Sequence, residues 1–182
     1  MNATLIIIAT IALLIVIIVC VYKYNLTKLK SYKSRIDGSQ KVITDELEER
    51  FQLVLKTKTM VNKITKKEID FYKELEDIKN TNISSFDLDK KINSAIDTIK
   101  VINNDYKKLS EKKEFKEILR KLDESDTKIT AAESFYNKNN NLLVTFTKRF
   151  VPKVIAKLNK IKIQPFYETV ELFDEDMKVI DE

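Results

Sequence analysis

A stretch near the start of the chain, 3–22, carries no charge and is apolar almost throughout. A helix of about 20 residues rises roughly 30 Å, the thickness of the hydrocarbon core of a bilayer, and it satisfies its backbone hydrogen bonds internally. Only Thr4, Thr10 and Cys20 are weakly polar, and a helical hydroxyl can bond to the carbonyl one turn earlier. The sequence therefore predicts a transmembrane anchor over residues 1–22.

Two other interpretations of this stretch exist. A cleaved secretory signal has a shorter apolar region, a basic region before it and a small-residue cleavage site after it, and the sequence shows none of these. A lipid-modified cysteine ends the signal of bacterial lipoproteins, and Cys20 is a candidate. However, Val19 stands where a small residue is usual. We predict a retained anchor, with extracytoplasmic, lipoprotein-like display of the remaining chain as the alternative.

The charges that flank the apolar stretch predict its orientation. No Lys or Arg precedes it, and no acid follows it before Asp37. The cations in that following segment are Lys23, Lys28, Lys30, Lys33 and Arg35. The positive-inside rule places this side in the cytoplasm, where the cations also attract anionic headgroups. We therefore expect a single-pass protein of the inner (cell) membrane with its N-terminus outside and its remaining residues cytoplasmic.

The composition after the anchor favours one helical domain. About 160 of the 182 residues remain, enough for one soluble domain with a real core. Charged residues make up 34% and hydrophobic residues 43%, with one Gly and two Pro. The chain has no His, and its single cysteine lies in the apolar stretch, so neither an imidazole base nor a zinc site is available. We predict an all-α protein that is not an enzyme, and the sequence predicts no cofactor or metal.

Apolar residues recur at helical spacing after the anchor. The pattern over 24–36 predicts that the anchor helix continues, and Gly38 need not interrupt it. The pattern then resumes over 40–79 and predicts one further helical region. Lys58, Thr65 and Glu68 fall near this apolar face. They form either a buried polar network or the edge of the face, and we favour the edge.

The second half of the chain predicts two more helices. Residues 80–85 are rich in Asn, Thr and Ser and read as a loop, with Ser84 capping the next helix. Ser110, followed by an acid, can cap a last helix of close to 40 residues that ends before Pro152.

Short motifs in the first part of the chain lie at a characteristic spacing. They are the Tyr24-Asn25 pair, the run ITDELEERFQLV over 43–54 with Leu47 and Arg50, and Glu68. These motifs resemble those of the LemA family of bacterial proteins. In that family a YN pair follows the membrane segment, and an I-D-x-Q-L-x-R-R-x-D-L-I-P run leads to a later H-E.

A second segment carries the resemblance further. The run LDESDTKITAAESFYN over 122–137 ends in Tyr136-Asn137, and Phe150 and Ala156 follow. It is similar to the family's L-x-x-T-E-N-x-I-x-x-A-R-x-x-Y-N with a later F-P-x-x-x-x-A. The departures are Thr44 for an acid, Leu55 for a proline, Glu133 for an arginine, Leu143-Val144 for a second YN, and Pro152 one place late.

The resemblance implies an N-terminal membrane helix followed by an elongated antiparallel four-helix up-and-down bundle in the cytoplasm. Family members have no established molecular function. Four helices require a turn near 49–52, where no Gly or Pro stands, and helix lengths favour that turn over one continuous helix. The residues matched as structural motif positions are Tyr24, Asn25, Leu47, Arg50, Glu68, Tyr136, Asn137, Phe150 and Ala156.

Positive charge gathers near the end of the chain. Between Ser134 and Tyr167 there are seven cations and no acid, whereas seven acids and one Lys follow. Val151, Val154, Ile155, Leu158 and Ile161 fall on one helical face among these cations. This pattern is typical of a helix on an anionic membrane surface or in a partner's groove, and the alternative is neutralisation by the acidic tail. The predicted contact residues are Lys148, Arg149, Lys153, Lys157 and Lys160.

The predicted organisation is an anchor over 1–22, a LemA-like bundle over 23–150, a basic amphipathic segment over 151–163 and an acidic tail over 164–182. We expect a non-catalytic scaffold or interaction module at the membrane, whose protein partner and oligomeric state the sequence does not name. We do not expect nucleic-acid binding, because the net charge of +5 is modest and no reading motif accompanies it. The competing hypothesis is a small-molecule sensor or enzyme that uses carboxylates such as Glu68 or Glu111 with Lys58.

Overall fold

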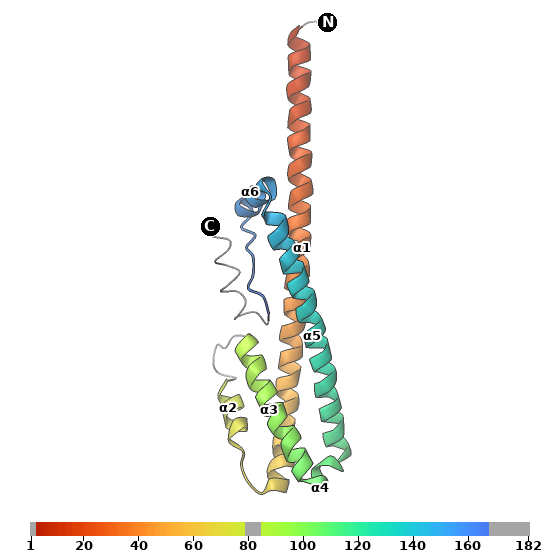
Figure 1. Ribbon diagram of the computed structural model, residues 1–182, viewed down its shortest axis with the longest axis vertical. Coiled ribbons are helices and arrows are strands. Elements are labelled where there is room, and N and C mark those ends of the chain that lie inside the picture. The colour runs from red at the N-terminus through yellow and green to blue at the C-terminus, as the bar shows by residue number, and fades with distance from the viewer. Residues whose placement is uncertain (1–2, 79–84, 168–182) are drawn as a thin grey trace. The chain divides into compact units, whose positions relative to one another are not determined.

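The structure is a computed structural model, and it describes residues 3–78 and 85–167. These residues form α-helices and short connecting segments, with no strand among them (Figure 1), which confirms the all-α prediction for this part of the chain. The predicted cap Ser84 and residues 168–182 of the predicted acidic tail lie outside the described residues. The helices are α1 (Ala3–Thr65), α2 (Asp70–Ile78), α3 (Ser85–Asp105), α4 (Lys107–Ser110), α5 (Lys113–Thr147) and α6 (Phe150–Leu158).

Helix α1 runs for 63 residues without interruption. The expected turn at 49–52 is therefore wrong, and the continuous helix is correct. Leu47, Phe51 and Val54 are all buried at helical spacing, so the apolar stripe passes straight through the expected turn. Gly38 is also helical, and no heavy atom lies within 4 Å of where its Cβ would stand. With neither a proline nor a strained glycine, the chain has no local reason to break here.

The prediction of one helical region over 40–79 is wrong at its end. Helix α1 stops at Thr65, and Lys66 takes a φ of 55°, which reverses the direction of the chain. Helix α2 then returns alongside α1, since the hydroxyls of Thr57 and Tyr72 lie 2.6 Å apart in the interior. Burial of Tyr72 and two further apolar residues of α2 stabilises this reversal. The sequence has no Gly at this point to indicate the turn.

The chain divides into two compact units, and α1 and α5 contribute to both. The first unit comprises Met1–Gly38 and Phe135–Glu182, and the second comprises Ser39–Ser134. The predicted boundaries at 22, 150 and 163 separate segments of different expected role, whereas these units are defined by packing. The predicted boundaries therefore stay predictions.

In the first unit α5 runs alongside α1 in the opposite direction, and α6 follows it (Figure 1). Helix α5 ends before Pro152, as predicted, and α6 accommodates this proline in its first turn, where a missing N–H costs little. The rings of Tyr32 and Phe146 meet edge to face at 5.9 Å between centroids. The core consists of Leu29, Ile36, Tyr136, Leu143, Ile155 and Ala156.

The second unit is built from the end of α1, from α2, α3 and α4, and from the start of α5. Most residues of the predicted apolar stripes lie in its core, in agreement with the helical periodicity that we inferred. Its buried apolar residues include Ile43, Leu47, Phe51, Val54, Val61, Tyr72, Leu75, Ile92, Ile96, Ile99, Leu109, Phe115, Ile118, Leu122 and Ile129.

The N-terminal part of α1 differs from the other described helices in its exposure. Residues 3–24 are exposed on all sides, although nearly all of those in 3–22 are apolar. The segment is long and apolar enough to cross a membrane, with a mean hydropathy of 3.3 over its most apolar window. Helix α1 therefore contains the candidate membrane span that the sequence predicts.

Candidate functional site

Helix α6 is apolar on two opposite faces. Pro152, Ile155 and Ala156 face the core and are buried. Phe150, Val151, Val154 and Leu158 face outward, with exposed fractions of 80%, 43%, 42% and 69%. The predicted single apolar face is therefore wrong in one respect, because Ile155 turns inward while its neighbours turn outward. Four apolar side chains remain uncovered on one short helix.

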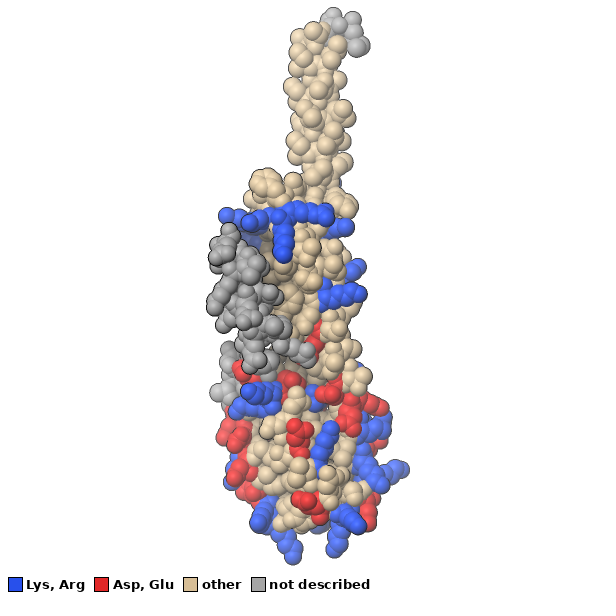
Figure 2. Space-filling view, viewed as in Figure 1, with Lys and Arg blue, Asp and Glu red and all other residues tan. Residues whose placement is uncertain are grey.

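The predicted basic contact residues lie on α6 or within two residues of its ends. Lys148, Arg149, Lys153, Lys157 and Lys160 are all exposed. Figure 2 shows Lys and Arg side chains gathered where the uncharged N-terminal part of the molecule ends. The structure thus places exposed positive charge and exposed apolar side chains on the same part of the chain.

A direct contact joins the end of α6 to the end of the candidate span. The side-chain amide of Asn159 donates a hydrogen bond to the hydroxyl of Tyr22 at 3.2 Å. The same amide donates to the carbonyl of Ile155 at 2.8 Å, which fixes it against the last turn of α6. The sequence offers no signal for this pair, since 137 positions separate the two residues.

The matched pair Tyr136-Asn137 binds the segment that follows α6. The amide of Asn137 donates to the carbonyl of Tyr167 and accepts from its N–H, both at 2.9 Å. Asn140 forms the same type of pair with Gln164, donating at 2.5 Å and accepting at 3.4 Å. Two asparagines one turn apart therefore hold the backbone of 164–167, in the way that a neighbouring strand would.

Tyr136 completes this contact. Its hydroxyl donates to the carbonyl of Pro165 at 3.0 Å, and its ring meets that of Tyr167 edge to face at 4.9 Å. Burial raises the pKa of the Tyr136 hydroxyl to about 12, so it stays a protonated donor at neutral pH. Tyr136 and Asn137, both matched as structural motif positions, thus hydrogen-bond to the backbone of a segment about 30 residues further along the chain.

The first matched pair, Tyr24-Asn25, has a more local role. Asn25 is nearly buried and donates to the carbonyl of Val21 at 2.7 Å, within its own helix. Tyr24 is exposed, and the ammonium group of Lys28 lies 5.4 Å from its ring centroid and 5.7 Å from that of Phe146. These cation–ring contacts lie just past the apolar span.

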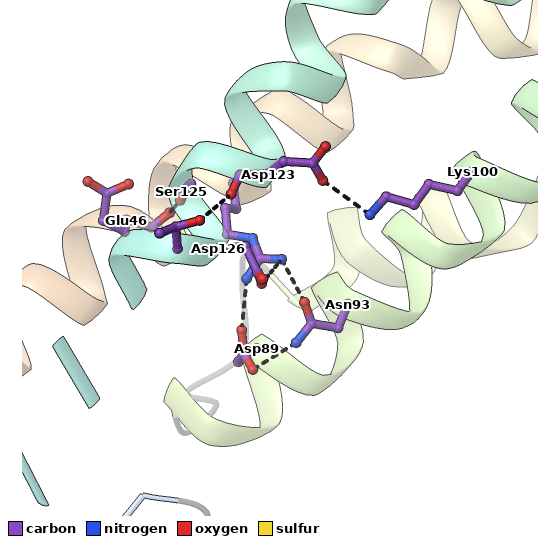
Figure 3. A network of polar contacts seen from close by, with 9 residues as sticks. Glu46, Asp89, Asn93, Lys100, Asp123, Ser125 and Asp126 are labelled. Carbon is purple, nitrogen blue, oxygen red and sulfur yellow. Dashed lines mark hydrogen bonds and ion pairs between the residues drawn. The ribbon is translucent and has the colours of Figure 1, made fainter. Parts of the chain in front are cut away.

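A network of polar contacts joins three helices in the second unit, and Figure 3 labels its members Asp89, Asn93 and Asp126. Arg50 of α1 has a side chain that is only 3% exposed. Its guanidinium donates to Asp89 of α3 at 3.3 Å and to Asn93 of α3 at 2.7 Å, and it pairs with Asp126 of α5 at 3.2 Å. The matched position Arg50 therefore serves the core of the unit, which needs the charge to be paired.

The neighbours of Arg50 extend this polar network. Asn93 donates to the second oxygen of Asp89 at 2.9 Å. Burial raises the pKa of the Asp89 carboxyl, and Arg50 opposes this shift less strongly. Nearby, Lys128 of α5 pairs with Glu46 of α1 at 2.8 Å. The network thus fastens α1 to α3 and α5 through charged groups whose geometry is mutually dependent.

The remaining matched and candidate residues lie apart from one another. Leu47 is in the core, and Glu68 is exposed and pairs with Lys73 at 3.2 Å. Lys58 pairs instead with Glu76 of α2 at 2.8 Å, and the hydroxyl of Thr65 bonds to its own helix. These groups form separate edge contacts rather than the buried network considered above.

A hollow of about 780 Å³ lies beside the arginine network. Its lining residues all belong to α3 and include Asp89, Asn93 and Asp97. Because one helix supplies the whole lining, the hollow is an open depression rather than an enclosed site. Among residues 3–78 and 85–167, no group of three His, Cys, Asp or Glu side chains is placed to hold a metal ion.

The comparison with protein families agrees with the motif resemblance. The sequence model of the LemA family matches residues 39–180, which include Arg50, Glu68, Tyr136-Asn137 and α6. No curated protein and no solved structure matches the chain. The family match covers well over half of the sequence, and the protein described here therefore belongs to the LemA family.

Proposed function

We propose that this protein is a membrane-anchored, non-catalytic helical module that presents an interaction surface at the cytoplasmic face of a bacterial inner membrane. Residues 3–22 form its single span, and the helices that follow form the module. Within the second unit we propose an up-and-down arrangement of four helical segments, supplied by α1, α2, α3 and α5.

The exposure of the first turns of α1 carries this proposal. A helix that exposes apolar side chains on every side is stable only where lipid surrounds it. The same helix continues without a break to Leu29 and Ile36, which lie in the core of the first unit. The proposed anchor and part of the core of the first unit thus belong to one continuous helix.

Retention of the span is supported by the contact at its end. Tyr22 is the last residue of the apolar stretch, and its hydroxyl accepts the hydrogen bond from Asn159. Asn25, three residues later, is already nearly buried. Cleavage of a signal at this point would remove a side chain that the folded unit uses.

A structural rather than catalytic role is supported by the pairing of the charged groups. Arg50, the most deeply buried charged side chain among the described residues, has three partners, and Lys58 and Glu68 pair with different side chains. A catalytic site needs a base or nucleophile aimed into a shared cleft, whereas each of these groups pairs with its own neighbouring side chains.

Cysteine labelling tests both the span and its orientation. In a Cys20→Ser background, Ala3→Cys places a thiol at the outer end of the proposed span and Lys63→Cys places one at the exposed end of α1. We expect a membrane-impermeant maleimide to label Ala3→Cys in intact spheroplasts, and to label Lys63→Cys only after lysis. Labelling of Lys63→Cys in intact spheroplasts would contradict the cytoplasmic orientation and favour extracytoplasmic display.

A further inference from the structure

We propose that α6 is a lipid-binding helix that lies in the headgroup region of an anionic bilayer, beside the anchor. In this arrangement Phe150, Val151, Val154 and Leu158 enter the boundary between headgroups and acyl chains, and the surrounding Lys and Arg side chains contact anionic headgroups. The inference rests on the proposed anchoring by residues 3–22, and it adds a second point of attachment.

The packing of α6 fixes which side faces outward. Pro152, Ile155 and Ala156 are buried in the first unit, so the helix cannot rotate to bury its other face. The outward face therefore stays apolar in water. Phe150 is 80% exposed and Leu158 is 69% exposed, which are the largest exposures among the large apolar residues of the described chain.

The position of α6 along the anchor sets its depth. Asn159, directly after α6, donates to Tyr22 at the end of the apolar stretch. Tyr side chains prefer the boundary between the acyl chains and water. A helix tied to Tyr22 lies at that same boundary, and its outward apolar face needs little movement to reach lipid.

The charges near α6 indicate that anionic lipid, rather than protein, covers its outward apolar face. Residues 134–167 contain seven cations and no acid, and those nearest α6 are exposed. An interfacial helix combines apolar side chains with Lys and Arg that reach the headgroups. Because α6 belongs to the same chain as the span, the span already holds it at the membrane surface. A helix of only nine residues can therefore add to the membrane affinity.

Single-tryptophan reporters test the proposal, because the chain has no Trp. Full-length Phe150→Trp and Leu158→Trp variants are reconstituted into vesicles of phosphatidylcholine and phosphatidylglycerol that contain lipids brominated near the headgroup. We expect quenching several-fold stronger than for Phe135→Trp. Phe135 is a matched control in the same unit, since it is also an exposed Phe. It lies 12 residues before the end of α5, which is about 18 Å along the helix.

A Leu13→Trp variant separates failure of this inference from failure of the anchor. Quenching of Leu13→Trp by deeply brominated lipid, with Phe150→Trp quenched no more than Phe135→Trp, overturns the lipid-binding helix and leaves the anchor intact. A blue-shifted but unquenched Phe150→Trp overturns it in favour of cover by protein, such as the acidic tail. An unquenched Leu13→Trp overturns the proposed anchoring itself.

A separate experiment tests the contact between the lysines of α6 and anionic headgroups. Lys153→Gln combined with Lys157→Gln, in the Phe150→Trp background, should reduce quenching in vesicles with phosphatidylglycerol to the level seen in phosphatidylcholine alone. Equal quenching of the lysine and glutamine forms in both vesicles would overturn the role of anionic headgroups.

Discussion

The side-chain amide of Asn137 forms two hydrogen bonds with the backbone of Tyr167, one to its carbonyl and one from its N–H, each 2.9 Å long. Asn140 repeats this pairing with Gln164. An extended segment without a strand partner would leave its backbone groups unsatisfied where they are partly buried. The two asparagines supply the missing partner and hold 164–167 against α5.

Replacement of Asn137 should release this segment selectively. Asn137→Ala removes both bonds to Tyr167, each worth about 1 kcal/mol. We expect hydrogen exchange, measured by mass spectrometry on the full-length protein in detergent micelles, to speed up by about 10-fold or more in peptides covering 161–167. The neighbouring Asn141 is exposed, so Asn141→Ala is the matched control. Equal exchange in both variants would show that the asparagine pairing does not hold the segment.

Arg50 should be among the most sensitive positions of the second unit. Arg50→Ala leaves Asp89 without its cation and opens a cavity among three helices, so we expect a loss of about 3 kcal/mol in the free energy of unfolding. Urea unfolding in detergent micelles, followed by circular dichroism, measures this loss. Arg120 is a suitable control, because it also pairs with two carboxylates, Glu117 and Glu124, but on an exposed surface. Comparable losses for Arg50→Ala and Arg120→Ala would contradict the special role of burial.

The stability of the protein should carry a pH dependence that originates at Asp89. Burial raises the pKa of this carboxyl above its ordinary value of 3.8, and the opposing effect of Arg50 is smaller. The folded chain then binds the proton more tightly than the unfolded chain does. The contribution of Asp89 to stability is therefore full below its ordinary pKa and is lost as the pH rises through the raised pKa.

Asp89→Asn isolates this contribution, because the amide does not titrate. We expect the free energy of unfolding of the wild type, relative to that of Asp89→Asn, to fall as the pH is raised from about 3 to about 7. Urea unfolding at a series of pH values gives the difference directly. A difference that stays constant, or that rises with pH, would show that Arg50 rather than burial controls Asp89.

Tyr72 should make the protein sensitive to alkali. Its side chain is buried, its hydroxyl lies 2.6 Å from that of Thr57, and burial raises its pKa to about 12 from 10.0. The unfolded chain ionises first, so stability falls between about pH 10 and pH 12, by up to about 2 to 3 kcal/mol. Tyr72→Phe should lose about 1 kcal/mol at neutral pH, where the hydrogen bond to Thr57 is intact, and should retain more of its stability at pH 11 than the wild type. Parallel losses in alkali for both proteins would contradict this origin.

The core could be predicted from the sequence because periodicity is a local property. Ile43, Leu47 and Val54 recur at helical spacing, and all three are buried. The turn expected at 49–52 was inferred from helix lengths. The absence of Gly and Pro at these positions indicated instead a continuous helix, which is what the structure has. The reversal at Lys66 had no such local signal, because the burial of Tyr72 and the rest of α2 drives it.

The partners of the polar side chains could not be predicted from the sequence, for a different reason. Arg50 meets Asp89 across 39 positions, and Asn137 meets Tyr167 across 30. Each pairing depends on how helices align, which no local pattern encodes. The motif positions Arg50, Tyr136 and Asn137 are among the residues that make these contacts, but the sequence does not show their partners.

Membrane association of the intact chain is the most direct test of the whole account. Membranes from cells that express the full-length protein are washed with high salt and then with alkaline carbonate, which strips proteins held only at the surface. We expect the protein to stay in the membrane pellet through both washes, because residues 3–22 lie in the hydrocarbon core. Recovery of the intact chain in the soluble fraction would contradict it.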